Sequence, residues 1–192
     1  MADRKRLPST FLNMLVVLTA IAIVSALALG FTYSVTKEAI AQVEVKRTMA
    51  AIKKVLPGFD NNPNEEKYSV KGYEKMEFYP AKKDGQPVGT AIKTFSDKGF
   101  NERIWIMVGI TKDNKINKIA VLKHKETPGL GTRMAERKFL SQFYGKDPAN
   151  FNLMVKKDGG DVDALSAATI TSRAFCEAAE RAYQAILEGD KK

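Results

Sequence analysis

The segment DALSAATITS, residues 163–172, concentrates hydroxyl side chains directly before a long alanine-rich pattern. Four of its last seven residues carry a hydroxyl group: Ser166, Thr169, Thr171 and Ser172. A helix needs only one such residue as its N-cap, because one side-chain oxygen can accept from the free amides of the first turn. A helix that begins near Ile170 would also present unpaired amides and a positive dipole end to a phosphate. The segment is therefore either a plain cap or an anion site, and a hydroxyl there could also be esterified.

A second segment, Glu126-Thr127-Pro128-Gly129-Leu130-Gly131-Thr132, follows an expected strand and precedes an expected helix. Its glycines permit close approach of the backbone, and the amides of residues 130–133 could point at a ligand. On the residues alone, we prefer a simple strand-to-helix turn with Thr132 as the N-cap.

Several common enzyme chemistries are excluded by composition. His124 is the only histidine, so a histidine-rich metal site is impossible and a Ser-His-Asp triad would have to use that residue. Cys176 is the only cysteine, which excludes an intrachain disulfide and a CxxC pair, and we expect it to be buried. No Walker or dinucleotide-type phosphate loop is present. The aspartates of DGGDVD, residues 158–163, could hold a cation, although a solvated turn is the preferred interpretation.

The elements that must position these segments begin with a membrane anchor. Phe11 to Tyr33 is apolar at nearly every position, and no charged residue lies between Arg6 and Lys37. About 20 apolar residues cross a hydrocarbon core of about 30 Å. A cleavable signal peptide is the alternative, because Ala26-Leu27-Ala28 resembles a cleavage site, but the apolar run exceeds the usual h-region of about 7 to 15 residues. We therefore favour an uncleaved anchor over residues 11–34.

The expected topology places the short tail, residues 1–10, in the cytoplasm and residues 37–192 outside. Three basic residues flank each end of the span, Arg4 to Arg6 on one side and Lys37, Lys46 and Arg47 on the other, so the positive count alone is tied. A short basic tail that stays in the cytoplasm is the simpler topology. The formal net charge of the chain is +9, yet no basic stripe interleaved with aromatic residues follows. We therefore expect the charge to face lipid headgroups or partner subunits, and we expect no nucleic acid.

An α+β fold is predicted for the rest of the chain, whose 44% hydrophobic residues suffice for a core. A stalk helix that ends at Pro57-Gly58 and a polar linker fill residues 35–74. The domain, residues 75–192, should be an antiparallel sheet with one face covered by helices. Its expected strands are MEFYPAKK, PVGTAIKTF, IWIMVGI, INKIAVLKHKE and a short FNLMVKK, and its expected helices are Arg133 to Tyr144 and Ser172 to Leu187.

The two candidate segments carry a family resemblance. DALSAATITS resembles the flavinylation motif of the FMN-binding domain family, and ETPGLG is similar to a second signature of that family. With one N-terminal span and this length, the chain resembles the G-subunit family of the Rnf electron transport complex. The C-subunit family of the sodium-translocating NADH:quinone reductase is related. Ala167 departs from the motif, because the family usually has glycine at this position.

The resemblance implies a role for each motif residue. Thr169 would be joined through its side-chain oxygen to FMN phosphate, with Asp163 and Ser166 as further motif residues. Thr171 and Ser172 would line the phosphate. The residues beside the flavin ring would be Glu126, Thr127, Gly129, Leu130 and Gly131. No residue is implied as a catalytic acid or base, and no metal site is implied.

The resemblance also implies a function. The chain would carry covalent FMN and pass electrons within an ion-translocating ferredoxin:NAD oxidoreductase of the bacterial inner membrane. It would be a single-pass electron carrier and not a complete enzyme. Its partners would be the other membrane subunits, membrane lipid, and a flavin transferase that uses FAD and Mg²⁺. The alternative is a membrane-tethered scaffold or ligand-binding module without a redox cofactor.

Overall fold

A computed structural model describes residues 10–189 and divides the chain into two compact units, Met1–Lys46 and Arg47–Lys192. The expected cytoplasmic tail lies outside the described residues except for Thr10. The elements are α1 (Phe11–Val55), β1 (Glu77–Lys83), β2 (Gln86–Ser96), β3 (Ile104–Thr111), β4 (Ile116–Lys123), η1 (Gly131–Ala135), α2 (Arg137–Leu140), η2 (Ser141–Phe143), η3 (Lys156–Asp158) and α3 (Thr169–Gly189).

Within the described residues, the first unit is the part of α1 that ends at Lys46, together with Thr10. The expected anchor and stalk helix are one helix, because α1 runs from Phe11 to Val55 without a break. By length and composition α1 can cross a membrane. The large apolar side chains of the first unit are exposed, as at Leu27 and Leu29. Lipid suits such a surface, since the backbone polar groups are satisfied within the helix.

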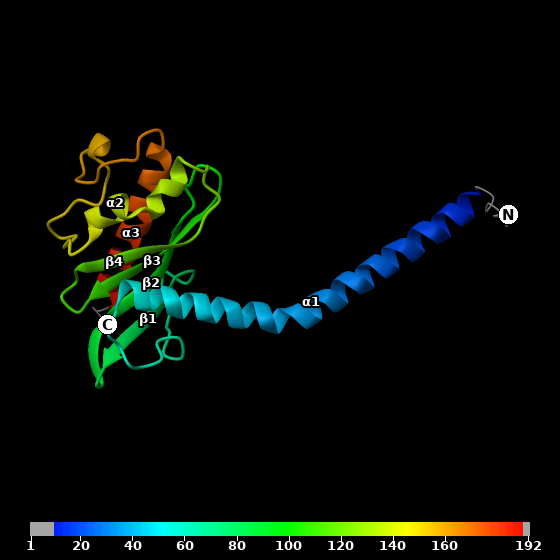
Figure 1. The fold of residues 1–192 in the computed structure, drawn as a ribbon, viewed down its shortest axis with the longest axis horizontal. Coiled ribbons are helices and arrows are strands. Elements are labelled where there is room, and N and C mark those ends of the chain that lie inside the picture. Colours follow the sequence, from blue (N-terminus) through cyan, green and yellow to red (C-terminus); the bar gives the residue numbers. More distant parts are fainter. Residues whose placement is uncertain (1–9, 190–192) are drawn as a thin grey trace. The chain divides into compact units, whose positions relative to one another are not determined.

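The second unit is built on a four-stranded antiparallel sheet in the order β1-β2-β3-β4 (Figure 1). All four long strands agree with the sequence prediction, although β4 ends at Lys123. The hairpin turns use residues that tolerate positive φ, with φ of 49° at Asp84, 76° at Gly85 and 57° at Asn114. In a hairpin the turn geometry sets the register of the two strands.

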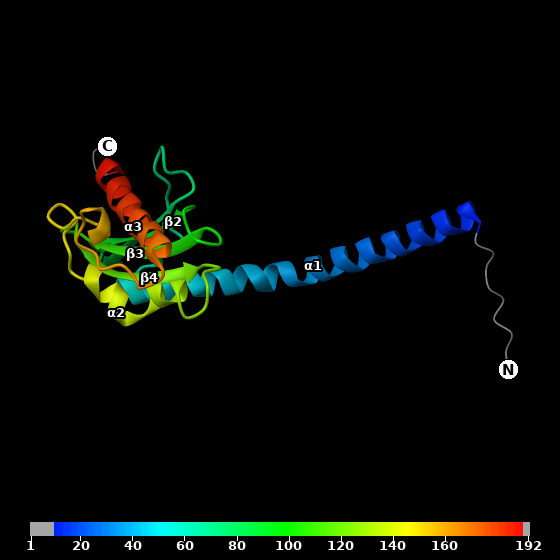
Figure 2. The same cartoon turned by 90° about the horizontal axis from the view of Figure 1, so that it is seen from above.

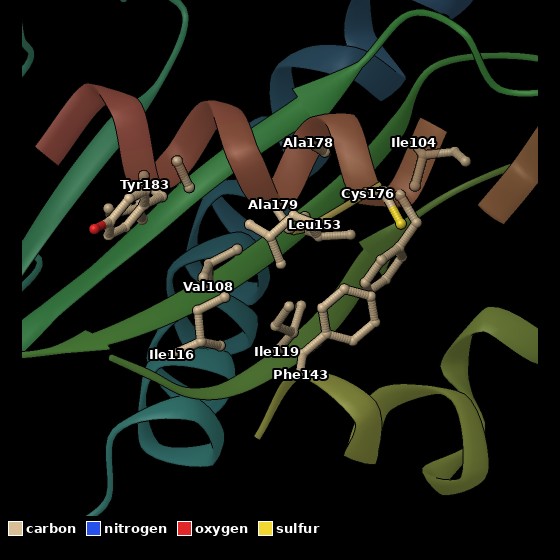
Figure 3. Packing of buried hydrophobic residues seen from close by; sticks show 14 of the residues in the cluster. Ile104, Val108, Ile116, Ile119, Phe143, Leu153, Cys176, Ala178, Ala179 and Tyr183 are labelled. Carbon is tan, nitrogen blue, oxygen red and sulfur yellow. The ribbon is translucent and has the colours of Figure 1, made fainter. Parts of the chain in front are cut away.

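One face of the sheet is covered by α3, which runs across the strands (Figure 2). Small side chains on α3, including Ala178 and Ala179, are fully buried and allow close approach to the sheet (Figure 3). The hydroxyl of Thr94 donates to the carbonyl of Ala178 at 3.1 Å and ties the helix to β2. The expected burial of Cys176 is confirmed. This core holds α3, and therefore its N-terminus, at a defined place on the sheet.

The other face of the sheet is covered by the end of α1, which the sequence did not predict. Ile52 and Val55 are fully buried there, in one cluster with Tyr79 and Met107. The helix ends at Val55, shortly before Pro57, because the residue ahead of a proline disfavours helical geometry. The compact unit therefore begins at Arg47 and includes residues that the sequence analysis assigned to a stalk and linker.

Two expected elements differ from the structure. Arg133 to Tyr144 is not one helix but the end of η1 followed by α2 and η2. FNLMVKK forms no named strand; it contributes an isolated bridge between Val155 and Val162, and its last residues enter η3. The contacts of this segment are irregular: the Asp161 carboxylate accepts from the Asn152 amide at 2.8 Å, and the Lys156 amide bonds to the Val162 carbonyl at 2.9 Å. The last helix is confirmed, but it begins at Thr169.

Candidate functional site

Both segments singled out in the sequence line one cavity in the second unit. Its volume is about 350 Å³, and it lies where the loop after β4 meets the N-terminus of α3. The lining residues are Phe100, Glu126, Thr127, Leu130, Gly131, Ala167, Ala168, Thr169, Ile170 and Thr171. The site therefore combines an apolar rim with hydroxyl and carboxylate groups, as ligand sites commonly do.

A buried contact joins the two segments across the chain. The Thr171 hydroxyl donates to Oε2 of Glu126 at 2.5 Å, and the Phe100 amide donates to Oε1 at 2.9 Å. Glu126 is 5% exposed and Thr171 is 2% exposed. The Glu126 amide in turn donates to Nδ1 of His124 at 3.3 Å. The carboxylate thus connects the loop after β2, the loop after β4 and the first turn of α3.

Gly131 makes this contact possible. A Cβ atom at Gly131 would lie 2.6 Å from Oε2 of Glu126 and 2.8 Å from Oγ1 of Thr171. Such distances are shorter than any real Cβ contact, so a side chain would push the two segments apart. The second glycine of ETPGLG is therefore required for packing, as the sequence suggested from its freedom of approach.

The start of α3 presents free donors to the cavity. Thr169 is the first residue of this 21-residue helix and is half-buried. The amide of Ser172 bonds to the Ala168 carbonyl at 3.0 Å, whereas the amides of Thr169, Ile170 and Thr171 have no acceptor among residues 10–189. Unpaired amides at a helix start are a ready anion site, because the helix dipole adds positive potential there.

The four hydroxyls of the segment have different surroundings. Ser172 is fully buried; its hydroxyl accepts from the Leu165 amide at 2.9 Å and donates to the Ala168 carbonyl at 3.0 Å. It stabilises the turn and is not among the cavity residues. Thr171 bonds to Glu126, Thr169 lines the cavity, and Ser166 is exposed. One hydroxyl thus holds the turn, and Thr169 is the one at the helix start.

Ala167 has a φ of 59°, which is the left-handed conformation that glycine adopts most easily. This is the position where the family motif usually has glycine. A left-handed conformation costs an alanine roughly 1 kcal/mol or more. The turn before Thr169 therefore keeps the geometry of a glycine although its residue is alanine.

Asp163 and Ser166 lie outside this cavity and line a second hollow of about 370 Å³. The Asp163 carboxylate pairs with Lys156 at 2.8 Å, and its amide donates to Gln142 at 2.7 Å. The neighbouring aspartates are also engaged separately: Asp158 pairs with Arg173, and Asp161 accepts from Asn152. Within the described residues, no group of three potential metal ligands forms here or elsewhere.

The ETPGLG segment is a tight turn whose amides are largely used internally. The amides of Leu130 and Thr132 bond to the Thr127 carbonyl at 3.2 and 3.4 Å, and that of Arg133 bonds to Leu130 at 3.2 Å. The Thr132 hydroxyl accepts from Gly129 at 3.0 Å. Of the four backbone amides of residues 130–133, which the sequence offered as ligand donors, three already bond within the turn. Leu130 instead offers an exposed apolar side chain.

Sequence reasoning missed Phe100 and Ile170 as site residues. Phe100 is 61% exposed and Ile170 is 48% exposed, and both line the cavity. An exposed aromatic in a turn-rich stretch gives no periodic signal that would single it out. Together with Leu130 they form an apolar rim. The residues present thus fit a flavin mononucleotide, with apolar side chains for the ring and a hydroxyl beside free amides for the phosphate.

Comparisons with known proteins identify relatives of this chain. Residues 99–184 match the FMN-binding domain family. The G subunit of the ion-translocating oxidoreductase complex of Vibrio cholerae is 33% identical over 182 residues, which cover 88% of this chain and 87% of that one. The corresponding G subunit of Aliivibrio fischeri is 33% identical over 86% of this chain and 85% of its own. The crystal structure of Shewanella oneidensis NqrC is 27% identical with a TM-score of 0.46, covering 56% of this chain and 54% of that chain.

The match to the FMN-binding domain family and the similarity to the G subunits are consistent with each other. The family match, over residues 99–184, includes both segments that line the cavity. Because 33% identity extends over most of both chains, the chain belongs to the G-subunit family of ion-translocating oxidoreductase complexes.

Proposed function

We propose that this chain is a membrane-anchored electron-transfer protein that carries FMN as a phosphoester of Thr169. The observation that carries the proposal is the position of Thr169, on the cavity lined by both signature segments and at the first residue of α3. Among residues 10–189, the amides of Thr169, Ile170 and Thr171 have no acceptor, and they would bind the phosphate. The names of the G-subunit relatives support a place in an ion-translocating oxidoreductase.

Attachment forms one bond and breaks one. The Thr169 oxygen bonds to the phosphorus of the FMN half of FAD, the pyrophosphate bond breaks, and AMP leaves while the hydroxyl proton is released. A flavin transferase with Mg²⁺ supplies the catalysis. The chain itself supplies an accessible hydroxyl and amide donors that bind the negative phosphate oxygens.

Once bound, the flavin accepts one or two electrons, and the protein supplies its position and its electrostatic surroundings. The ester prevents loss of the cofactor outside the cytoplasm. The apolar rim of Phe100, Leu130 and Ile170 excludes water from part of the ring. No side chain of the chain needs to act as an acid or a base.

The anchor places this carrier next to its partners. In our proposal α1 crosses the bacterial inner membrane, the second unit lies on the outer side, and the other membrane subunits of an Rnf-type ferredoxin:NAD complex donate and accept its electrons. Lipid surrounds the exposed apolar side chains of α1.

Coexpression with a flavin transferase tests the proposal. The expected result is a protein band that fluoresces after denaturing electrophoresis, with an intact mass increased by one esterified FMN. Thr169→Ala should abolish both signals, whereas Ser69→Ala should retain them, since Ser69 is exposed and lies outside both signature segments and the cavity. A dark band with the bare polypeptide mass would instead support a scaffold without a redox cofactor. Flavin on Thr169→Ala would place the ester elsewhere.

A further inference from the structure

Glu126 is a buried carboxylate without a counter-ion on the wall of the proposed flavin cavity. It is 5% exposed and lines the same cavity as Thr169. Among residues 10–189, no basic nitrogen lies within ion-pair distance of it. Both oxygens accept hydrogen bonds, from Thr171 and from the Phe100 amide.

A buried charge without an opposite charge opposes folding, because it loses water and gains no ion pair. Glutamine has the same shape, and its amide oxygen could accept from Phe100 while its amide nitrogen donated to Thr171. Packing and hydrogen bonding therefore do not require a carboxylate at this position. The property that glutamine could not supply is the negative charge.

We propose that Glu126 sets the reduction potential of the bound flavin and holds it low. The inference rests on the proposed function, since it concerns the flavin joined to Thr169. It assigns Glu126 a tuning role through its charge, in addition to its structural contact with Thr171.

The physical reason is electrostatic repulsion in a poorly hydrated site. Reduction adds negative charge to the ring, and a fixed negative charge on the wall of the same cavity makes that addition less favourable. Burial keeps water and salt from screening the interaction. The donors from Thr171 and Phe100 offset part of the charge and fix its position.

The test is the midpoint potential of the full, flavin-loaded chain, measured by spectroelectrochemistry after intact mass has confirmed attachment. Glu126→Gln should favour the reduced flavin at least tenfold, which is about 30 mV for a two-electron couple. Glu136→Gln is the matched control, because it removes the same charge from an exposed site and should shift the equilibrium less than tenfold.

Loaded Glu126→Gln with an unchanged or lower potential would overturn the inference. Should Glu126→Gln fail to fold or to take up flavin, Thr171→Val tests the inference instead. This variant keeps the Glu126 carboxylate and removes the hydroxyl that donates a hydrogen bond to it. We expect Thr171→Val to lower the potential, and an unchanged or raised value would equally overturn the inference. A wild-type chain without any attached flavin would be a different failure, that of the proposed function itself.

Discussion

The side-chain amide of Asn117 donates a hydrogen bond of 2.5 Å to the carbonyl oxygen of Val55, the last residue of α1. The carbonyls of a final helical turn have no partner within the helix, so β4 supplies one of them from the sheet. Gly109 allows this approach, because a Cβ atom there would lie 2.6 Å from the same carbonyl oxygen. The end of α1 is therefore part of the folded unit.

A truncated chain that begins at Arg47 should fold, and one that begins at Gly58 should be much less stable. The shorter chain loses Ile52, Val55 and Leu56, which are at most 2% exposed and cover one face of the sheet. Each such side chain contributes about 1.5–3 kcal/mol on burial. Urea unfolding followed by circular dichroism measures the difference. Equal midpoints for the two chains would contradict the role assigned to the helix end.

Much of this fold was predictable because its signals are local. The strands alternate between faces and are separated by residues suited to tight turns, and α3 follows a helical apolar pattern. The packing of Ile52 and Val55 on the second face of the sheet was not predictable. The apolar face of a helix is visible in a sequence, but the surface against which that face packs is not. FNLMVKK has strand-like residues, but it meets the stretch around Asp161 and Val162 through an isolated bridge and a bond to the Asp161 carboxylate, and not through a regular ladder.

The two segments of the candidate site were predictable from the sequence, whereas the contacts that bring them together were not. Hydroxyls before a helix and glycines in a turn are visible in the sequence, and both segments do line one cavity. The bond between Glu126 and Thr171 joins residues 45 positions apart, which no local pattern reports. The same limit applies to Ser172, whose hydroxyl stabilises the turn because the chain folds back on Leu165.

Ala167→Gly should stabilise the domain. Ala167 has a φ of 59°, and glycine removes a strain of roughly 1–2 kcal/mol while adding about 0.5–1 kcal/mol of unfolded-state entropy cost. We expect a net gain of up to about 1.5 kcal/mol, measured by urea unfolding of the chain that begins at Arg47. Ala168→Gly is the control and should destabilise, since Ala168 is buried and does not have positive φ. A loss of stability in Ala167→Gly would show that the turn is unstrained.

Gly131→Ala should disrupt the cavity. The added methyl group would overlap both Glu126 and Thr171, at 2.6 and 2.8 Å, and would separate the loop from the start of α3. Overpacking of this kind costs about 1–3 kcal/mol. We expect lower stability and a smaller fraction of flavin-loaded chain by intact mass.

The control for Gly131→Ala is Gly189→Ala, where the nearest atom to an added methyl, in Val70, is at an ordinary 3.4 Å. This variant should load flavin as the wild type does. Normal loading of Gly131→Ala would mean that the two segments separate without consequence for attachment.

Asp158→Asn should destabilise the domain at neutral pH and not in acid. Hydrogen bonds from Arg173, both 2.7 Å, lower the pKa of Asp158 below its ordinary 3.8. A lowered folded-state pKa means that the stabilisation is present above pH 3.8 and is lost as the pH falls through the folded value. Urea midpoints of mutant and wild type should therefore converge in acid. Asp113→Asn, in an exposed turn, is the control with the same change of charge.

Cys176 should resist alkylation in the native chain. Burial, with smaller effects from Glu180 and Asp158, raises the pKa of its thiol to about 12, and the thiolate is the reactive form. Iodoacetamide at mildly alkaline pH should leave the native mass unchanged and should add one label after unfolding in urea. Gln184→Cys places a second thiol on an exposed position of the same helix, and this variant should take up one label while native. Rapid labelling of the native wild type would show that α3 opens from the sheet, because only that motion would expose the thiol.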